Sequence, residues 1–424
     1  MSTELLFPPF ESKWWNDILD RTNGLKKTSV FKNCMDSNET EEMRGQILDI
    51  IRLIIQHKTP EYGFRVFING KTLKTEELES FFNSSLPNET ETFEEWSSRC
   101  FGNDKFGIII NRGEKFSPYL VEKIATKIQP LTQKIGIPRL GVTFTIFIGN
   151  YGWTPLGIHT DGLGENVMHF HLGKGSKTMY TWDPPLYEAN VEADKRFNNT
   201  NIPEILHLAD EFPFDEGDIY YMPHGEYHVG KSDELSIGLT LWFNNHTKGS
   251  LSRKIFDSFF SKNFVDNKEL LELDKSDFDD MTNFQDIEVT FQDVERLKKN
   301  SGYASLEETY REYKTALFSN CGFWEDPFPK SLQLDNSRDY TIQIISPFKI
   351  LYYIDNNLNL FVRGRKISLK NDADLLSFVE KLNSGALITK EEAISTFNSS
   401  WDLSVKEYML STFYSHHILN IKYV

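Results

Sequence analysis

The chain has 424 residues, 39% of them hydrophobic and 14% aromatic, which is enough for several folded domains and too apolar for a disordered chain. Its net charge of −16 opposes general binding to nucleic acid, because that binding depends on Lys and Arg side chains that neutralise phosphates. The three cysteines are far apart, and the sequence has neither a signal-peptide pattern nor an apolar run of eighteen residues. These features exclude a disulfide framework and a membrane-spanning helix, and they predict a cytoplasmic protein.

Residues 1–105 are expected to form a helical and strand cover for a central domain. Residues 39–58 carry apolar side chains at helical spacing, and Asn69-Gly70 stands between two short apolar runs, as in a β-hairpin. The acidic stretch 83–96 is interpreted as a surface loop that leads into a helix. No pattern in this region points to chemistry.

Residues 106–150 predict the first strands of the central domain. Residues 106–110 form an apolar run typical of a buried strand, and Ser117 followed by Pro118 is typical of a helix start. Residues 142–150 then alternate between an apolar face and a face that contains Thr143, Thr145 and Phe147. If that second face points into a barrel, Thr145 could hydrogen-bond a bound acid; a solvated threonine face is the alternative.

The segment 157–161, Gly-Ile-His-Thr-Asp, holds the first candidate metal ligands. His159 and Asp161 are two residues apart, so on an extended segment their side chains point to the same side. An imidazole and a carboxylate there offer two neighbouring ligands to a divalent metal. His-x-Asp alone is a weak motif, because a lone histidine is more often structural.

The next predicted strand region, residues 167–182, is either one strand or two strands with a kink at residues 173–175. Simple alternation would place His169, His171 and Lys177 on one face, where they either line a pocket or bond to neighbouring strands. Residues 182–214 follow as a long, charged insert. An insert of this length is typically a lid, a substrate-binding element or a partly helical segment.

Residues 217–230 supply the third candidate ligand. His228 follows an aromatic residue after a turn that contains Pro and Gly, and strand-like segments flank it. His224, four residues earlier, is the alternative ligand in this segment. Two histidines and one carboxylate on a triangle leave coordination positions open, as in non-haem Fe(II) oxygenases.

The remainder of the chain predicts two further units. Residues 249–330 contain several segments with apolar residues at helical spacing, which indicate a helical region that could form a dimer interface. Residues 338–424 predict strands, short helices and a last strand, as in a small winged-helix-like domain. No helix in that domain is markedly basic.

Taken together, residues 157–161, 175–177, 217–228 and 236–244 resemble the JmjC and cupin-like Fe(II)/2-oxoglutarate-dependent oxygenases. The layout of the whole chain is similar to the ribosomal-oxygenase type, with a barrel, a helical region and a winged-helix-like domain. The resemblance implies an α+β fold whose residues 106–248 form a double-stranded β-helix, or jelly-roll barrel. It also implies a homodimer.

The resemblance also implies the site. His159, Asp161 and His228 would bind Fe(II), and a lysine would bind the far carboxylate of 2-oxoglutarate, with O₂ as the second co-substrate. Lys177 is the expected residue, because it fits the Gly-x-Lys context, although it requires a loop insertion; Lys174, at the usual spacing from His159, is the alternative. The implied activity is hydroxylation of a C–H bond in a peptide or protein. Two alternatives are the same chemistry on a small metabolite and a non-catalytic cupin-fold binding protein.

Overall fold

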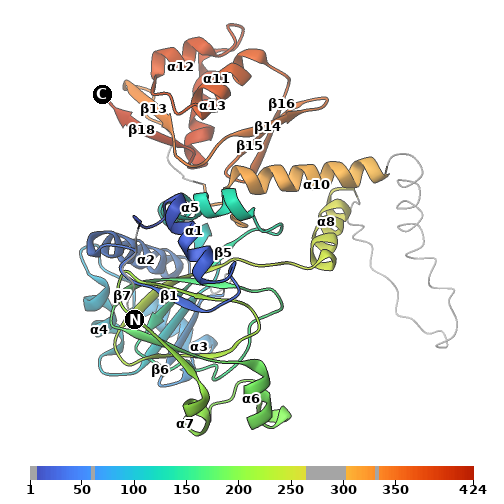
Figure 1. Ribbon diagram of the computed structural model, residues 1–424. Helices are drawn as coiled ribbons and strands as arrows, with labels where there is room; N and C mark the ends of the chain where they lie inside the picture. The colour runs from blue at the N-terminus through green and yellow to red at the C-terminus, as the bar shows by residue number, and fades with distance from the viewer. Residues whose placement is uncertain (1–6, 59–62, 264–301, 330–333) are drawn as a thin grey trace, which may run out of the picture.

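The computed structural model describes residues 7–58, 63–263, 302–329 and 334–424. It contains a barrel with surrounding helices and a separate C-terminal unit, and helix α10 (Gly302–Ser319) runs between them (Figure 1). In these residues no helix is long and apolar enough to cross a membrane.

The larger sheet of the barrel has eight antiparallel strands in the order β1-β10-β7-β12-β5-β4-β2-β3. These strands are β1 (Ser29–Phe31), β10 (Ile219–Met222), β7 (Val167–Lys174), β12 (Ser236–Trp242), β5 (Thr143–Gly149), β4 (Phe106–Ile110), β2 (Arg65–Ile68) and β3 (Lys71–Thr72). The predicted hairpin at Asn69-Gly70 is therefore the β2–β3 turn.

The smaller sheet has four antiparallel strands in the order β6-β11-β8-β9. They are β6 (Gly152–Trp153), β11 (Tyr227–Ser232), β8 (Lys177–Trp182) and β9 (Asp210–Phe214). Along the chain, β5 to β12 cross between the two sheets at every connection except β8–β9, so that β10-β7-β12-β5 faces β6-β11-β8-β9. This is the strand order of a double-stranded β-helix, and the predicted fold class is confirmed.

The alternation of side chains along the strands separates an apolar outside from a polar inside. The outward residues of β5, β7, β10 and β12 join one large core with helices α1 (Ser12–Arg21), α2 (Ser37–His57) and α5 (Pro118–Ile135). The inward positions of the same sheet include Thr145, His169 and Thr240, all of them buried. Polar side chains inside an apolar shell indicate a site, because burying them without a partner costs free energy.

The first hundred residues are more than a cover. Strand β1 pairs with β10 at one edge of the larger sheet, while β2 pairs with β4 near the other edge. The expected boundary at residue 105 therefore divides a continuous sheet. Residues 85–92 form the expected loop, which follows helix α3 (Thr75–Ser84) and leads into helix α4 (Phe93–Phe101).

The insert between β8 and β9 is partly helical and packs against the outside of the smaller sheet. Helices α6 (Pro184–Asn190) and α7 (Ile202–Ile205) belong to it. Tyr187, Val191 and Ile202 from the insert form a small core with Trp182, Tyr227 and Val229 of the strands. The insert is thus anchored beside the strand that carries His228.

The C-terminal half contains helices and two small sheets. Helix α8 (Lys248–Asn263) packs on α10, and the predicted helical segments between residues 264 and 301 lie outside the described residues. The last unit contains β13 (Tyr340–Ile344), β14 (Leu351–Ile354), β15 (Leu358–Val362), β16 (Arg365–Leu369), α11 (Ala373–Asn383), β17 (Ile388–Thr389), α12 (Lys390–Thr396), α13 (Leu403–Ser415) and β18 (Leu419–Tyr423). The terminal strand pairs with β13, whereas β14, β15 and β16 form a sheet of their own.

A buried carboxyl group beneath β5 gives the fold a pH dependence. Glu114 is fully buried and accepts hydrogen bonds from the Thr143 hydroxyl at 2.6 Å and from the Phe144 amide at 3.0 Å. Burial raises the pKa of Glu114 from 4.5 to about 7. Because the folded state holds the proton more tightly, the associated stability is complete below the unfolded pKa and is lost as the pH rises through about 7.

We therefore expect the free energy of unfolding of the wild type to fall, relative to that of Glu114→Gln, as the pH rises from about 4.5 to about 7. The expected change is up to about 3 kcal/mol, since each pKa unit corresponds to about 1.4 kcal/mol. Urea unfolding of both proteins in mildly acidic and mildly basic buffer measures it. A difference between the two proteins that does not depend on pH would contradict this account.

Candidate metal centre

The chain segment that carries His159 is held between two neighbours. The backbone amide of His159 donates to the carbonyl of His228 at 3.2 Å, and the amide of His228 donates back at 2.9 Å. On the other side, Ile158 and Asn199 exchange backbone hydrogen bonds of 2.8 and 3.2 Å. The insert and β11 thus fix the extended segment on which His159 lies, and place it opposite His228.

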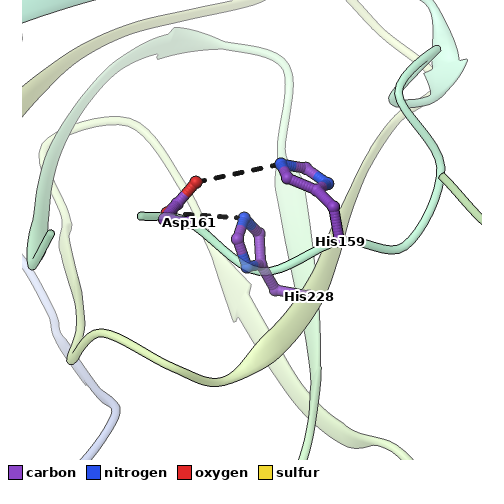
Figure 2. Close-up of side chains that lie close together, drawn as sticks. All are labelled: His159, Asp161 and His228. Carbon is purple, nitrogen blue, oxygen red and sulfur yellow. Dashed lines mark ion pairs between the residues drawn. The ribbon is translucent and has the colours of Figure 1, made fainter. Parts of the chain in front are cut away.

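The side chains of His159, Asp161 and His228 converge on one point (Figure 2). One potential ligand atom of each residue lies within 4.8 Å of the other two. The carboxylate of Asp161 lies 3.9 Å from Nε2 of His159 and 3.7 Å from Nε2 of His228. These separations exceed a hydrogen bond but suit three ligands around one ion with bonds of about 2 Å.

Backbone carbonyls orient both rings. Nδ1 of His159 lies 2.9 Å from the carbonyl oxygen of Gly157, and Nδ1 of His228 lies 3.2 Å from that of Glu226. If each Nδ1–H donates to its carbonyl, both Nε2 atoms present lone pairs toward Asp161. This arrangement fixes the tautomer that a metal requires.

The protonation states suit a metal as well. Burial, with a smaller effect of nearby His159, lowers the pKa of His228 to about 3, so its ring is neutral at physiological pH. Burial raises the pKa of Asp161 to about 6, although His159 opposes this rise. One carboxylate oxygen of Asp161 is buried without a hydrogen-bond partner in the described residues. A buried carboxylate of this kind costs free energy unless a cation neutralises it, and a divalent ion fits this set of donors.

The two candidate lysines lie in different surroundings. Lys177, at the start of β8, is 7% exposed and points into the barrel, where its Nζ lies 5.6 Å from the centre of the Phe147 ring. Within the described ranges it has no acidic partner. Lys174 points outward, and its Nζ lies 3.4 Å from a carboxylate oxygen of the surface residue Glu94. Only Lys177 is placed to meet an acid inside the barrel.

Thr145 is buried and lines the barrel, which is one of the two alternatives that the alternation along its strand left open. Its hydroxyl accepts a hydrogen bond from Nε1 of Trp242 at 3.0 Å and lies 3.3 Å from Oδ1 of Asn111. Thr145 is therefore engaged with its own chain, and a bound acid would have to compete with these two partners. Its placement supports a role in shaping the interior.

The expectation that His169, His171 and Lys177 share one strand face needs correction. Strand β7 carries both histidines in the larger sheet, whereas Lys177 begins β8 in the smaller sheet. The break falls at residues 175 and 176, so the lysine faces the histidines across the barrel. Alternation within one continuous strand could not predict this geometry, because the chain changes sheets between them.

The structure also separates the two candidate histidines of residues 217–230. His224 is exposed and lies apart from the group of three ligands, so the structure favours His228. The backbone carbonyls that orient the histidine rings were not anticipated, since a carbonyl has no sequence signature.

Comparison with known proteins adds evidence on the fold. No protein-family model matches the sequence, and no curated protein is significantly similar to it. A crystal structure of Escherichia coli ycfD aligns over 100% of both chains, with a TM-score of 0.50 and 14% sequence identity. A further structure of YcfD, described as a ribosomal oxygenase, aligns over 100% of both chains with a TM-score of 0.47 and 14% identity. A complex of YcfD with cobalt and 2-oxoglutarate aligns over 96% of this chain and 98% of its own, with a TM-score of 0.46 and 14% identity.

The similarity to ycfD at a TM-score of 0.50 establishes the class of fold, an α+β chain built around a double-stranded β-helix. At 14% identity it establishes the fold alone. Any assignment of chemistry must therefore depend on the residues in the barrel.

Proposed function

We propose that this protein is an Fe(II)- and 2-oxoglutarate-dependent oxygenase that hydroxylates a C–H bond. The observation that carries the proposal is the group of His159, Asp161 and His228, with both Nε2 atoms and the carboxylate directed to one point. Two histidines and one carboxylate with open positions are typical of non-haem Fe(II) oxygenases. Iron bound there, with 2-oxoglutarate and O₂, would supply the oxidising chemistry.

The side chains of the barrel would bind the metal ion and orient 2-oxoglutarate. The three ligands would hold the ion at the edge of the barrel interior, and Lys177 would pair with the far carboxylate of 2-oxoglutarate. The Lys177 ammonium is buried without an acidic partner in the described part of the chain, so an arriving carboxylate would supply its counter-charge. A structure of E. coli YcfD is described as a complex with cobalt and 2-oxoglutarate, and the site proposed here would hold a metal ion and the same oxoacid.

We further propose a peptide or protein as the substrate. A cleft of about 1630 Å³ reaches Thr181 and Glu226. Thr181 pairs with His228 across two strands, and the Glu226 carbonyl lies 3.2 Å from Nδ1 of His228. Clefts for small ligands are usually about 300–1,000 Å³, so this one suits an extended chain. The description of YcfD as a ribosomal oxygenase points toward ribosomal proteins as the first substrates to try.

The direct test of activity is succinate formation. Anaerobic protein with Fe(II) and 2-oxoglutarate is mixed with O₂ in the presence of ribosomal-protein peptides, and succinate and peptide mass are measured. The proposal expects succinate and a mass gain of one oxygen atom on a peptide. Bound iron and 2-oxoglutarate without succinate from any peptide would favour a non-catalytic binding protein.

We also propose that the chain forms a homodimer through the helical region 249–330. Phe256 on α8 is 48% exposed and lines a cavity of about 640 Å³ together with Leu306 and Tyr310 of α10. Phe259 on the same helix is only 3% exposed, so its ring belongs to the core of the single chain. The exposed ring of Phe256 suits an interface, as does that of Phe260, which is 40% exposed on the same helix.

We expect Phe256→Glu to convert a dimer into a monomer in light scattering of the full chain, because the charge would be buried at the interface. Tyr408→Glu, at a residue that is 71% exposed on α13 of the C-terminal unit, is the matched control and should stay dimeric. Dissociation in the Tyr408 variant alone would place the interface in the last domain.

A further inference from the structure

Four polar residues form one row across the inside of the larger sheet. The strand pairings place Tyr220, His169, Thr240 and Thr145 at the same level on four neighbouring strands. All four are buried. The row faces the smaller sheet, which carries His228 and Lys177, so it forms the opposite wall of the proposed co-substrate site.

Within this row, His169 has one ring nitrogen in use and one without a partner. Its Nδ1 lies 2.7 Å from the hydroxyl oxygen of Thr240. Its Nε2 is buried and has no hydrogen-bond partner in the part of the chain that the structure describes. If the Thr240 hydroxyl donates to Nδ1, the proton of the neutral ring lies on Nε2. A buried N–H group without an acceptor costs free energy that a bound ligand can recover.

The missing side chain of Gly238 makes room for this ring. A Cβ atom at residue 238 would collide with Cε1 and Nε2 of His169. Gly238 pairs with Phe147 on the adjacent strand, and Nζ of Lys177 lies 5.6 Å from the centre of the Phe147 ring. The His169 ring beside Gly238 and the Lys177 ammonium beside Phe147 thus lie next to one cross-strand pair, and the charge of Lys177 is near enough to lower the pKa of His169.

We infer that Nε2–H of His169 and the ammonium of Lys177 hold the same carboxylate of 2-oxoglutarate above the ring of Phe147. Thr240 would fix the donating tautomer, and Gly238 would leave the space for the ring. The inference depends on the proposed function and adds His169 as a second binding residue for the co-substrate.

The electrostatics suit this division of roles. Burial lowers the pKa of His169 well below its ordinary value, and the nearby charge of Lys177 lowers it further. The ring is then neutral and contributes a hydrogen bond without a second positive charge. The single charge of the Lys177 ammonium thus balances the single charge of the carboxylate, and His169 adds a neutral donor.

The test uses three substitutions at two residues of the full chain. His169→Leu removes the donor, whereas the amide nitrogen of His169→Gln can occupy nearly the same place as Nε2. Gly238→Ala displaces the ring. Affinity for 2-oxoglutarate is measured anaerobically by calorimetry on the Mn²⁺-loaded proteins, and Mn²⁺ affinity is measured separately as a check on the fold and the metal site.

We expect His169→Leu and Gly238→Ala to bind 2-oxoglutarate roughly ten- to a hundredfold more weakly, with Mn²⁺ affinity unchanged. His169→Gln should recover most of the loss. Tyr221→Phe is the control, because Tyr221 is buried on the outer side of the same sheet, where its hydroxyl donates to the Leu25 carbonyl, and this variant should bind like the wild type. Wild-type affinity in His169→Leu, no recovery in His169→Gln, or an equal loss in Tyr221→Phe would overturn the inference. A wild type that binds Mn²⁺ but no 2-oxoglutarate would instead contradict the proposed function.

Discussion

His228→Ala is expected to lose metal affinity by more than about a hundredfold and to lose oxygenase activity with it. Removing a residue that only supports a ligand typically weakens metal binding 10- to 100-fold, so removing a ligand should exceed that range. Within the described residues no fourth His, Cys, Asp or Glu belongs to this group, so no neighbouring side chain is placed to replace the imidazole. Calorimetric titration with Mn²⁺ or Co²⁺ measures the change.

His224→Ala is the matched control. His224 lies four residues before His228 and is exposed, so its loss should leave metal affinity at the wild-type value. If the two variants behaved in the opposite way, His224 would be the ligand. The group of three side chains in Figure 2 would then not be the metal site.

The second large effect is expected at Lys177. Lys177→Ala should raise the concentration of 2-oxoglutarate needed for half-saturation roughly thirtyfold or more, because removing one partner of a buried charge pair costs about 2–5 kcal/mol. The measurement is anaerobic 2-oxoglutarate binding to the metal-loaded protein, beside succinate formation as a function of 2-oxoglutarate.

Lys174→Ala is the control for this prediction. Its ammonium lies on the outer surface beside Glu94, so its removal should change the 2-oxoglutarate requirement less than about twofold. A larger effect at Lys174 than at Lys177 would move the carboxylate site, and it would also contradict the role inferred for His169.

The sequence was most informative where chemistry and strand geometry coincide. His159 and Asp161 could be paired because an extended segment directs alternate side chains to one side, and His228 followed from its place after an aromatic residue. The alternation along residues 142–150 placed Thr145 on one face of a strand but left open whether that face points into the barrel or to solvent. The pairing of His159 with Asp161 needed only local geometry, whereas the choice of His228 also needed the pattern of the resembling family.

Long-range pairing limited the remaining predictions. The choice between Lys174 and Lys177 depends on where one strand ends and the next begins in the other sheet. The contribution of β1 and β2 to the larger sheet depends on partners more than a hundred and about forty residues away in sequence, respectively. The ring of His169 on β7 packs over Gly238 on β12, and these two strands become neighbours only when the barrel closes. No local pattern encodes such contacts.

The measurement that tests the central claim most directly is the optical titration of the anaerobic Fe(II)-loaded protein with 2-oxoglutarate. Chelation of the ferrous ion by a 2-oxoacid produces a visible metal-to-ligand charge-transfer absorption, which requires iron and co-substrate at one centre. The account predicts a saturable band in the wild type, no band in His228→Ala, and a band that needs a far higher 2-oxoglutarate concentration in Lys177→Ala. A wild type that binds Fe(II) tightly yet develops no band with 2-oxoglutarate would contradict it.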